Sequence, residues 1–151
     1  HKFGGNTERQ ETYKQAEQRL ITQLQSMLTE EMVSQGQYDK WHRECCEQLI
    51  ESFAAVGKHK MYYGQAQKWI NMALKYLFVL DRELTSRNYQ FFHIPIDNIV
   101  LEKLATMNEP PVLTTAWSRL DSYEEYLKFQ ARYRSAFAGT PMDNEFTLWM
   151  K

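Results

Sequence analysis

Three cations and one amide recur along a single stretch of the chain at spacings of three, four and seven residues: Lys68, Asn71, Lys75 and Arg82. At about 100° per residue, these positions share one narrow face of a helix. Lysine offers phosphate oxygens a point charge, and arginine offers them a planar fork of donors. This cationic stripe predicts an anion-binding groove for an RNA or DNA backbone or for a phosphorylated ligand. The alternative is the solvated edge of a core helix, where Lys and Arg keep their charged ends in water.

The remaining circumference of the same predicted helix, about residues 61–86, is apolar. Its apolar positions recur at helical spacing: Ala66, Ile70, Ala73, Leu77, Leu80 and Leu84, with Trp69, Leu74 and Phe78 beside them. A helix that is apolar over most of its circumference normally lies at the centre of a domain. We therefore predict that this helix is the core of the fold. Lys58 and Lys60 precede it and would lengthen the cationic stripe at that end.

A second group of residues could carry acid–base chemistry. His93 and Asp97 are four residues apart, and Arg87 precedes them. A histidine beside a carboxylate can act as a general base, and an arginine can stabilise the negative charge of a phosphoryl transition state. The three residues are therefore candidate catalytic groups. The competing interpretation is that His93 and Asp97 cap the helix that follows them.

The run Arg87-Asn88, four further residues and then His93 resembles the Arg-x4–6-His signature of HEPN-type ribonucleases, a family of small helical bundles. The resemblance implies metal-independent RNA cleavage by Arg87 and His93 at a dimer interface, with Asn88 as the polar residue that follows the arginine. It covers seven residues of this chain. Pro95 departs from the family pattern, because the signature lies within or against a continuous helix.

Other chemistry-bearing residues have weaker patterns. Asp81 falls near the apolar side of the central helix, so it is expected to bind a backbone amide or an arginine, or to mark a functional site. His42, Cys45 and Cys46 have a spacing that can bind zinc, but the chain has no second ligand pair. We therefore expect buried thiols and predict no metal and no cofactor.

Composition limits the function classes. The 151 residues predict one domain, residues 1–151, with residues 1–6 as a flexible start. The net charge of −1 gives no overall attraction to nucleic acid, so such binding needs a local patch. No apolar run is long enough to span a membrane. The only cysteines are adjacent and cannot pair without strain, which favours a reducing compartment, the cytoplasm.

The pattern of apolar residues and breakers predicts an all-α bundle of five to six helices. The expected helices cover residues 7–34, 39–56, 61–86, 95–107, 122–138 and 140–149, with a short turn at 115–120. Gly36 should end the first helix, Asp39 should cap the second, and Ser122 should open the fifth.

Three functions remain open from the sequence. The first is a binding module for an anionic partner, and the second is the ribonuclease that the HEPN resemblance implies. The third is a protein-interaction or scaffold domain, with a protein partner or a homodimer. Nine Tyr and four Trp could supply interface anchors for that role.

Overall fold

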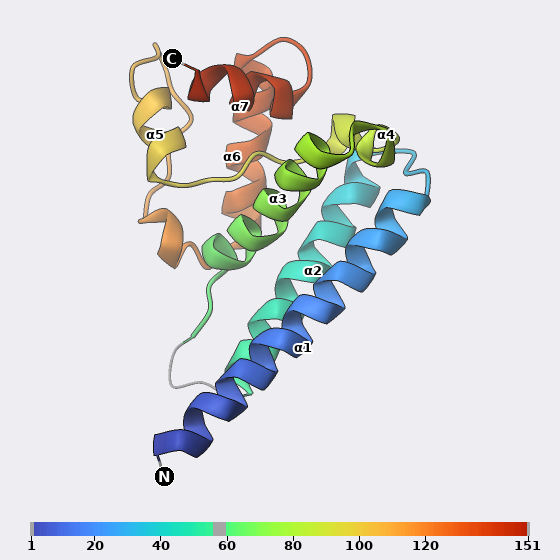
Figure 1. The fold of residues 1–151 in the computed structure, drawn as a ribbon. Helices are drawn as coiled ribbons and strands as arrows, with labels where there is room; N and C mark the ends of the chain where they lie inside the picture. The colour runs from blue at the N-terminus through green and yellow to red at the C-terminus, as the bar shows by residue number, and fades with distance from the viewer. Residues whose placement is uncertain (1, 56–59, 151) are drawn as a thin grey trace.

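A computed structural model describes residues 2–55 and 60–150, and it confirms the predicted all-α, single-domain fold (Figure 1). None of these residues lies in a β-strand. The helices are α1 (Lys2–Thr29), α2 (Gln35–Ala54), α3 (Tyr63–Leu80), α4 (Arg82–Thr85), α5 (Asn98–Leu104), α6 (Tyr123–Ala136) and α7 (Pro141–Trp149). Two 3-10 turns join them, η1 (Tyr89–Phe91) and η2 (Trp117–Arg119).

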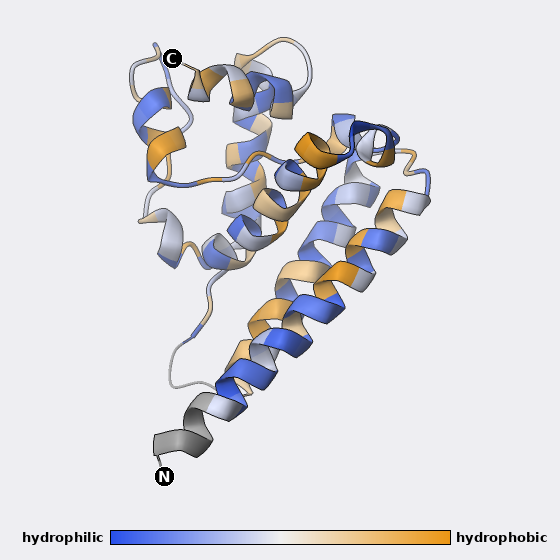
Figure 2. Cartoon of the chain, viewed as in Figure 1, coloured by the Kyte–Doolittle hydropathy of each residue, from blue (hydrophilic) through white to orange (hydrophobic). Residues whose placement is uncertain are grey.

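Helices α1 and α2 form an antiparallel hairpin, and α3 packs along α2 (Figure 1). The buried side chains of α1 recur at helical spacing: Ala16, Leu20, Leu24, Met27 and Leu28. Tyr13, which the same spacing places on this face, is 50% exposed. In Figure 2 the ribbon of α1 is mostly hydrophilic on its outer side, and apolar residues gather where α1 meets α2 and along α3. The hairpin and α3 therefore share one core.

The predicted boundary between the first two helices is wrong. Helix α1 ends at Thr29, and α2 begins at Gln35. Ser34 is the N-cap, because its hydroxyl accepts a hydrogen bond of 3.1 Å from the amide of Gln37. Gly36 lies inside α2 and does not end α1. Asp39 therefore does not cap α2, although we had expected it to. Its carboxylate contacts His93 instead.

Helix α3 lies at the centre, but it is shorter than predicted. Ala66, Ile70 and Leu74 are fully buried, as expected for the core helix. The helix ends at Leu80, because the carboxylate of Asp81 accepts a hydrogen bond of 3.0 Å from the amide of Leu84 and starts α4. Leu80 and Leu84 consequently point away from the core and are exposed.

A buried non-helical segment, residues 92–97, crosses α3 and α6 (Figure 1). We predicted a helix from residue 95, but α5 begins only at Asn98, after its N-cap Asp97. A buried segment without helical hydrogen bonds needs other partners for its backbone. Gln67 of α3 binds both the amide and the carbonyl of Ile96, at 3.1 and 2.8 Å. Gln130 of α6 binds both groups of Ile94, at 3.1 and 2.9 Å.

The turn η2 packs directly on the first turn of α3. The amide of Gly64 donates a hydrogen bond of 3.0 Å to the carbonyl of Leu120. A Cβ atom at Gly64 would lie 1.6 Å from the carbonyl oxygen of Trp117, so only glycine permits this approach. Ser122 then caps α6 as predicted, since its hydroxyl accepts a hydrogen bond from the amide of Glu125.

None of the described helices has both the length and the apolar composition that a membrane-spanning helix needs.

Candidate functional site

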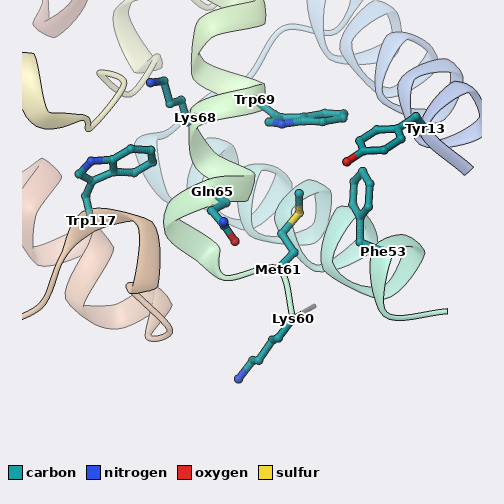
Figure 3. Close-up of a pocket in the computed structure, with 8 residues that line it drawn as sticks. All are labelled: Tyr13, Phe53, Lys60, Met61, Gln65, Lys68, Trp69 and Trp117. Carbon is teal, nitrogen blue, oxygen red and sulfur yellow. The ribbon is translucent and has the colours of Figure 1, made fainter. Parts of the chain in front are cut away.

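A cavity of about 340 Å³ lies at the start of α3 (Figure 3). Four of its lining side chains are aromatic and come from four different elements, and two are lysines. The lining residues are Tyr13, Phe53, Lys60, Met61, Gln65, Lys68, Trp69 and Trp117. We call this cavity the aromatic–lysine pocket.

One side of the aromatic–lysine pocket is a cluster of three rings from α1, α2 and α3 (Figure 3). Tyr13 stacks on Trp69 with 6.1 Å between the ring centroids and 21° between the planes. Phe53 meets Trp69 edge to face at 5.4 Å. Tyr13 is 50% exposed, so the cluster presents part of its aromatic surface to solvent. We call these three residues the hairpin-side cluster.

The other side of the pocket consists of Trp117 and Lys68 (Figure 3). Trp117 is fixed in place because its indole nitrogen donates a hydrogen bond of 3.0 Å to the side chain of Asn98. Lys68 Nζ lies 4.9 Å from the centroid of the Trp117 ring, a cation–π contact. The close approach at Gly64 brings η2, and with it Trp117, against α3.

Both pocket lysines also meet a carboxylate. Lys60 Nζ lies 2.5 Å from Asp121, and this hydrogen bond raises the pKa of Lys60. Lys68 Nζ lies 3.7 Å from Asp97. The Lys60–Asp121 pair is exposed and contributes little to stability, so an anionic ligand can compete with Asp121 for Lys60. Asp97 is buried, but the side chain of Lys68 is 39% exposed and can meet a ligand from the solvent side. The pocket therefore combines exposed aromatic faces with two available cations.

A second polar cluster lies in the interior, and we call it the buried histidine network. His42 Nδ1 lies 2.8 Å from the Tyr123 hydroxyl, and its Nε2 lies 2.8 Å from Asn71 Oδ1. His93 Nδ1 lies 2.7 Å from the Tyr126 hydroxyl, and its Nε2 lies 2.7 Å from Asp39. The two imidazole rings are 4.5 Å apart between centroids.

Burial sets the protonation of the buried histidine network. Burial lowers the pKa of His42, and the nearby His93 lowers it further. Burial also lowers the pKa of His93, against the opposing effect of the hydrogen bond to Asp39. For Asp39 burial raises the pKa, but hydrogen bonding to His93 and Gln35 outweighs it and the net pKa is lowered. Both rings are therefore neutral at pH 7 and have no exposed surface, which fits a structural role.

The four residues of the cationic stripe do not share one surface. Lys68 lines the aromatic–lysine pocket, whereas Asn71 is fully buried in the histidine network. Lys75 Nζ binds Glu145 at 2.8 Å, and Arg82 lies over the ring of Phe78. Residues 92–97 and helices α6 and α7 contact this side of α3, so the alternative of a continuous solvated edge is wrong for Asn71. The anion-binding role of these four residues stays a prediction. Of the two residues that would lengthen the stripe, Lys60 lines the pocket and Lys58 lies outside the described residues.

The three candidate catalytic residues are also in separate places. The Arg87 guanidinium donates a hydrogen bond of 2.6 Å to the carbonyl of Thr29, beside a different cavity between α1 and α4. His93 belongs to the buried histidine network, and Asp97 caps α5 through a hydrogen bond of 2.9 Å from the amide of Val100. The capping interpretation of Asp97 is thereby confirmed.

Asn88, the polar residue of the HEPN resemblance, is buried and holds the turn after α1. Its side-chain oxygen accepts a hydrogen bond from the amide of Met32, and its nitrogen donates to the carbonyls of Met27 and Glu30. Through these contacts Asn88 stabilises the turn between α1 and α2. The catalytic role of Arg87, His93 and Asp97 stays a prediction.

The two cysteines lie in the core near His42. Cys46 Sγ is 3.7 Å from His42 Nδ1. Burial raises the pKa of Cys45 to about 12 and also raises that of Cys46, so both are neutral thiols. Within residues 2–55 and 60–150, no three His, Cys, Asp or Glu side chains form a group that could hold a metal ion.

The sequence did not indicate the aromatic side chains of the pocket as a site. Trp69 was expected beside the apolar face of the central helix, and helical spacing places Tyr13 on the buried face of α1. Trp117 follows the Pro110-Pro111 break, and an aromatic side chain in such a short connecting turn is the one signal that could have been used.

Compared with models of known protein families, with curated proteins and with solved structures, the chain matches none.

Proposed function

We propose that this protein is a binding module for a ligand that carries both an aromatic ring and a phosphate, the chemistry of a nucleotide unit. The observation behind this proposal is the aromatic–lysine pocket, in which four aromatic side chains and two lysines surround one cavity of about 340 Å³. The proposed ligand is anionic, like the partner inferred from the sequence, but we propose that it binds at the start of α3 and not along the whole cationic stripe.

The size and the chemistry of the pocket both support such a ligand. Cavities that hold small ligands have volumes of roughly 300–1,000 Å³. Aromatic side chains stack on bases whatever the base, and lysines attract phosphate as point charges. Gln65 uses its side-chain oxygen to accept a hydrogen bond from the amide of Tyr62, at 3.0 Å. Its NH2 group can then donate to a base or a phosphate oxygen.

Titration with nucleoside monophosphates tests the proposal. We expect calorimetry with AMP and UMP to show binding, and Trp117→Ala to weaken it about 5- to 100-fold, the range of one lost stacking contact. Lys68→Ala should weaken binding as well. Trp149→Ala is the matched control, because Trp149 lies in α7 and outside the pocket. An equal loss in the control, or no binding of either nucleotide to the parent protein, contradicts the proposal.

The ribonuclease alternative stays a prediction and has a direct test. Arg87 is exposed, so Arg87→Ala should leave the fold intact, whereas His93→Ala would disturb the core. RNA cleavage in EDTA that Arg87→Ala abolishes would favour the ribonuclease over the binding module.

The scaffold alternative also stays a prediction. It is supported by the apolar end of α3, where Tyr76, Val79 and Leu80 are 62%, 62% and 81% exposed. Apolar side chains that lie together on a surface often mark a protein contact.

A further inference from the structure

We infer that the aromatic–lysine pocket binds a single strand of nucleic acid, with one base on Trp117 and a neighbouring base on the hairpin-side cluster. This inference rests on the proposed function and adds the class of ligand. Two observations support it. The aromatic rings of the pocket form two separate groups, and most backbone amides at the start of α3 are already hydrogen-bonded.

The aromatic surface of the pocket is divided in two. Trp117 and Lys68 lie on one side of the first turns of α3, and Tyr13, Phe53 and Trp69 lie on the other (Figure 3). The three rings of the hairpin-side cluster contact one another, whereas Trp117 is held separately by Asn98. A free mononucleotide has one base and would leave one aromatic group without a stacking partner. Two successive bases of a strand use both.

The start of α3 offers few backbone amides to a polyphosphate. Helix N-termini bind such groups through their first backbone amides, which must be available. Here the amide of Gly64 is bonded to Leu120, and the amides of Gln65 and Ala66 are bonded to the carbonyl of Tyr62. The amide of Tyr62 is bonded to the side chain of Gln65. The charges that remain for phosphates are those of Lys60 and Lys68, with the NH2 group of Gln65 as a neutral donor beside them. One cation for each phosphate suits the single charges of a phosphodiester backbone.

A duplex does not fit the same surface. In a duplex the faces of the bases are covered by their neighbours in the stack, so aromatic side chains cannot stack on them. Reading a duplex through its grooves requires a protruding helix or ribbon. The aromatic–lysine pocket is concave and offers ring faces, which is the chemistry of single-strand binding.

Fluorescence anisotropy with labelled oligonucleotides tests the inference. The probes are oligothymidylate and oligouridylate of about six nucleotides, within the usual footprint of single-strand sites, and a blunt hairpin duplex. Unlabelled dTMP and UMP serve as competitors. We expect both single strands to bind at least about tenfold more tightly than the mononucleotides or the hairpin.

The Trp variants locate the two bases. Trp117→Ala and Trp69→Ala should each weaken single-strand binding about 5- to 100-fold, and the combined variant should show the product of the two losses. Trp117→Phe keeps a ring and should retain most of the affinity, which separates stacking from folding. Circular dichroism melts check that each variant is folded, and Trp149→Ala is again the matched control.

Each outcome decides the matter. If the mononucleotides bind as tightly as the single strands, the inference fails and the proposed function stands. Equal binding of the hairpin also overturns the inference, as does a loss confined to one of the two Trp variants. If no probe binds, the inference and the proposed function fail together.

Discussion

The hydroxyl of Tyr126 donates a hydrogen bond of 2.7 Å to Nδ1 of His93. This direction follows from the other partners, because Asn71 Nδ2 donates to the same hydroxyl at 3.0 Å and leaves its proton for His93. His93 Nε2 then carries the proton and donates to Asp39. His42 Nε2 likewise donates to Asn71 Oδ1. A neutral His42 then accepts at Nδ1 from the Tyr123 hydroxyl at 2.8 Å, which turns that proton away from the carbonyl of Asp39, 3.1 Å from the same hydroxyl oxygen. With this arrangement both rings of the buried histidine network are neutral.

The first prediction concerns pH. Because the folded state lowers the pKa of His42 and His93, the unfolded chain binds more protons below the ordinary histidine pKa of about 6.5. Stability should therefore be complete above that pH and should fall as the pH drops below it. The lowered pKa of Asp39 acts in the same direction, but only below its ordinary value of about 4.

Urea denaturation at pH 7.5, 6.0 and 5.0 measures this effect through the midpoint. Replacing one ring, as in His93→Gln, should lower stability at pH 7.5 and reduce the slope of stability against pH. A midpoint that stays constant from pH 7.5 to pH 5.0 in the parent protein would contradict the neutral network.

The second prediction concerns Gly64. A Cβ atom there would overlap the carbonyl oxygen of Trp117, and backbone atoms cannot move aside as a flexible side chain can. Gly64→Ala should destabilise the fold by about 1–3 kcal/mol or more and should weaken ligand binding by moving Trp117. Gly36→Ala is the control, since its nearest neighbour would be 3.9 Å away and it lies in α2. That change should be neutral or stabilising by up to about 1 kcal/mol, and denaturation measures both.

The third prediction concerns salt. Each phosphate that a lysine neutralises on a single strand contributes about −0.7 to the slope of log K against log salt. With Lys60 and Lys68 engaged, the slope should be about −1.4, and replacing either lysine by Ala should bring it to about −0.7. Lys40, exposed on α2, provides the control, whose replacement should leave the slope unchanged. A much steeper slope would mean that binding uses a different and more basic surface.

The fourth prediction concerns the glutamines that hold residues 92–97. Gln130→Met keeps the side-chain length but leaves both backbone groups of Ile94 without that partner. Buried polar groups without partners cost about 1–3 kcal/mol each, so we expect a loss of about 2–5 kcal/mol by urea denaturation. Gln25→Met on the exposed face of α1 should change stability by less than about 0.5 kcal/mol. Similar losses for the two variants would show that the buried glutamine makes no special contribution.

Periodicity was enough to predict the apolar core along the first part of α3, but not at its end, where Leu80 and Leu84 are exposed. Ala66, Ile70 and Leu74 recur at helical spacing and are fully buried, because burial of one helix face follows directly from the pattern. The same pattern placed Asn71 on a polar stripe facing a ligand or, in the alternative, solvent, and the structure instead buries it. A polar residue in a helix is buried when a distant segment needs its hydrogen bonds, and no local spacing records such a need.

The ends of the helices and the position of the pocket could not be predicted from local sequence patterns, because both depend on tertiary contacts. Asp81 and Ser34 each start a helix by binding an amide three residues on, and several nearby polar residues could have served equally well in the sequence. The pocket aromatics come from four elements, so only tertiary packing brings Tyr13 and Trp117 to one cavity.

The way Gln67 and Gln130 hold the chain also limits how the connection into α5 can change. Each glutamine forms hydrogen bonds with both the amide and the carbonyl of a single residue. These two residues, Ile94 and Ile96, are separated by one position. Inserting or deleting a residue between them would shift the register, so that one glutamine would face the wrong amide and the isoleucines would leave their sites in the core. The segment of residues 92–97 can therefore tolerate changes in its side chains far more easily than a change in its length.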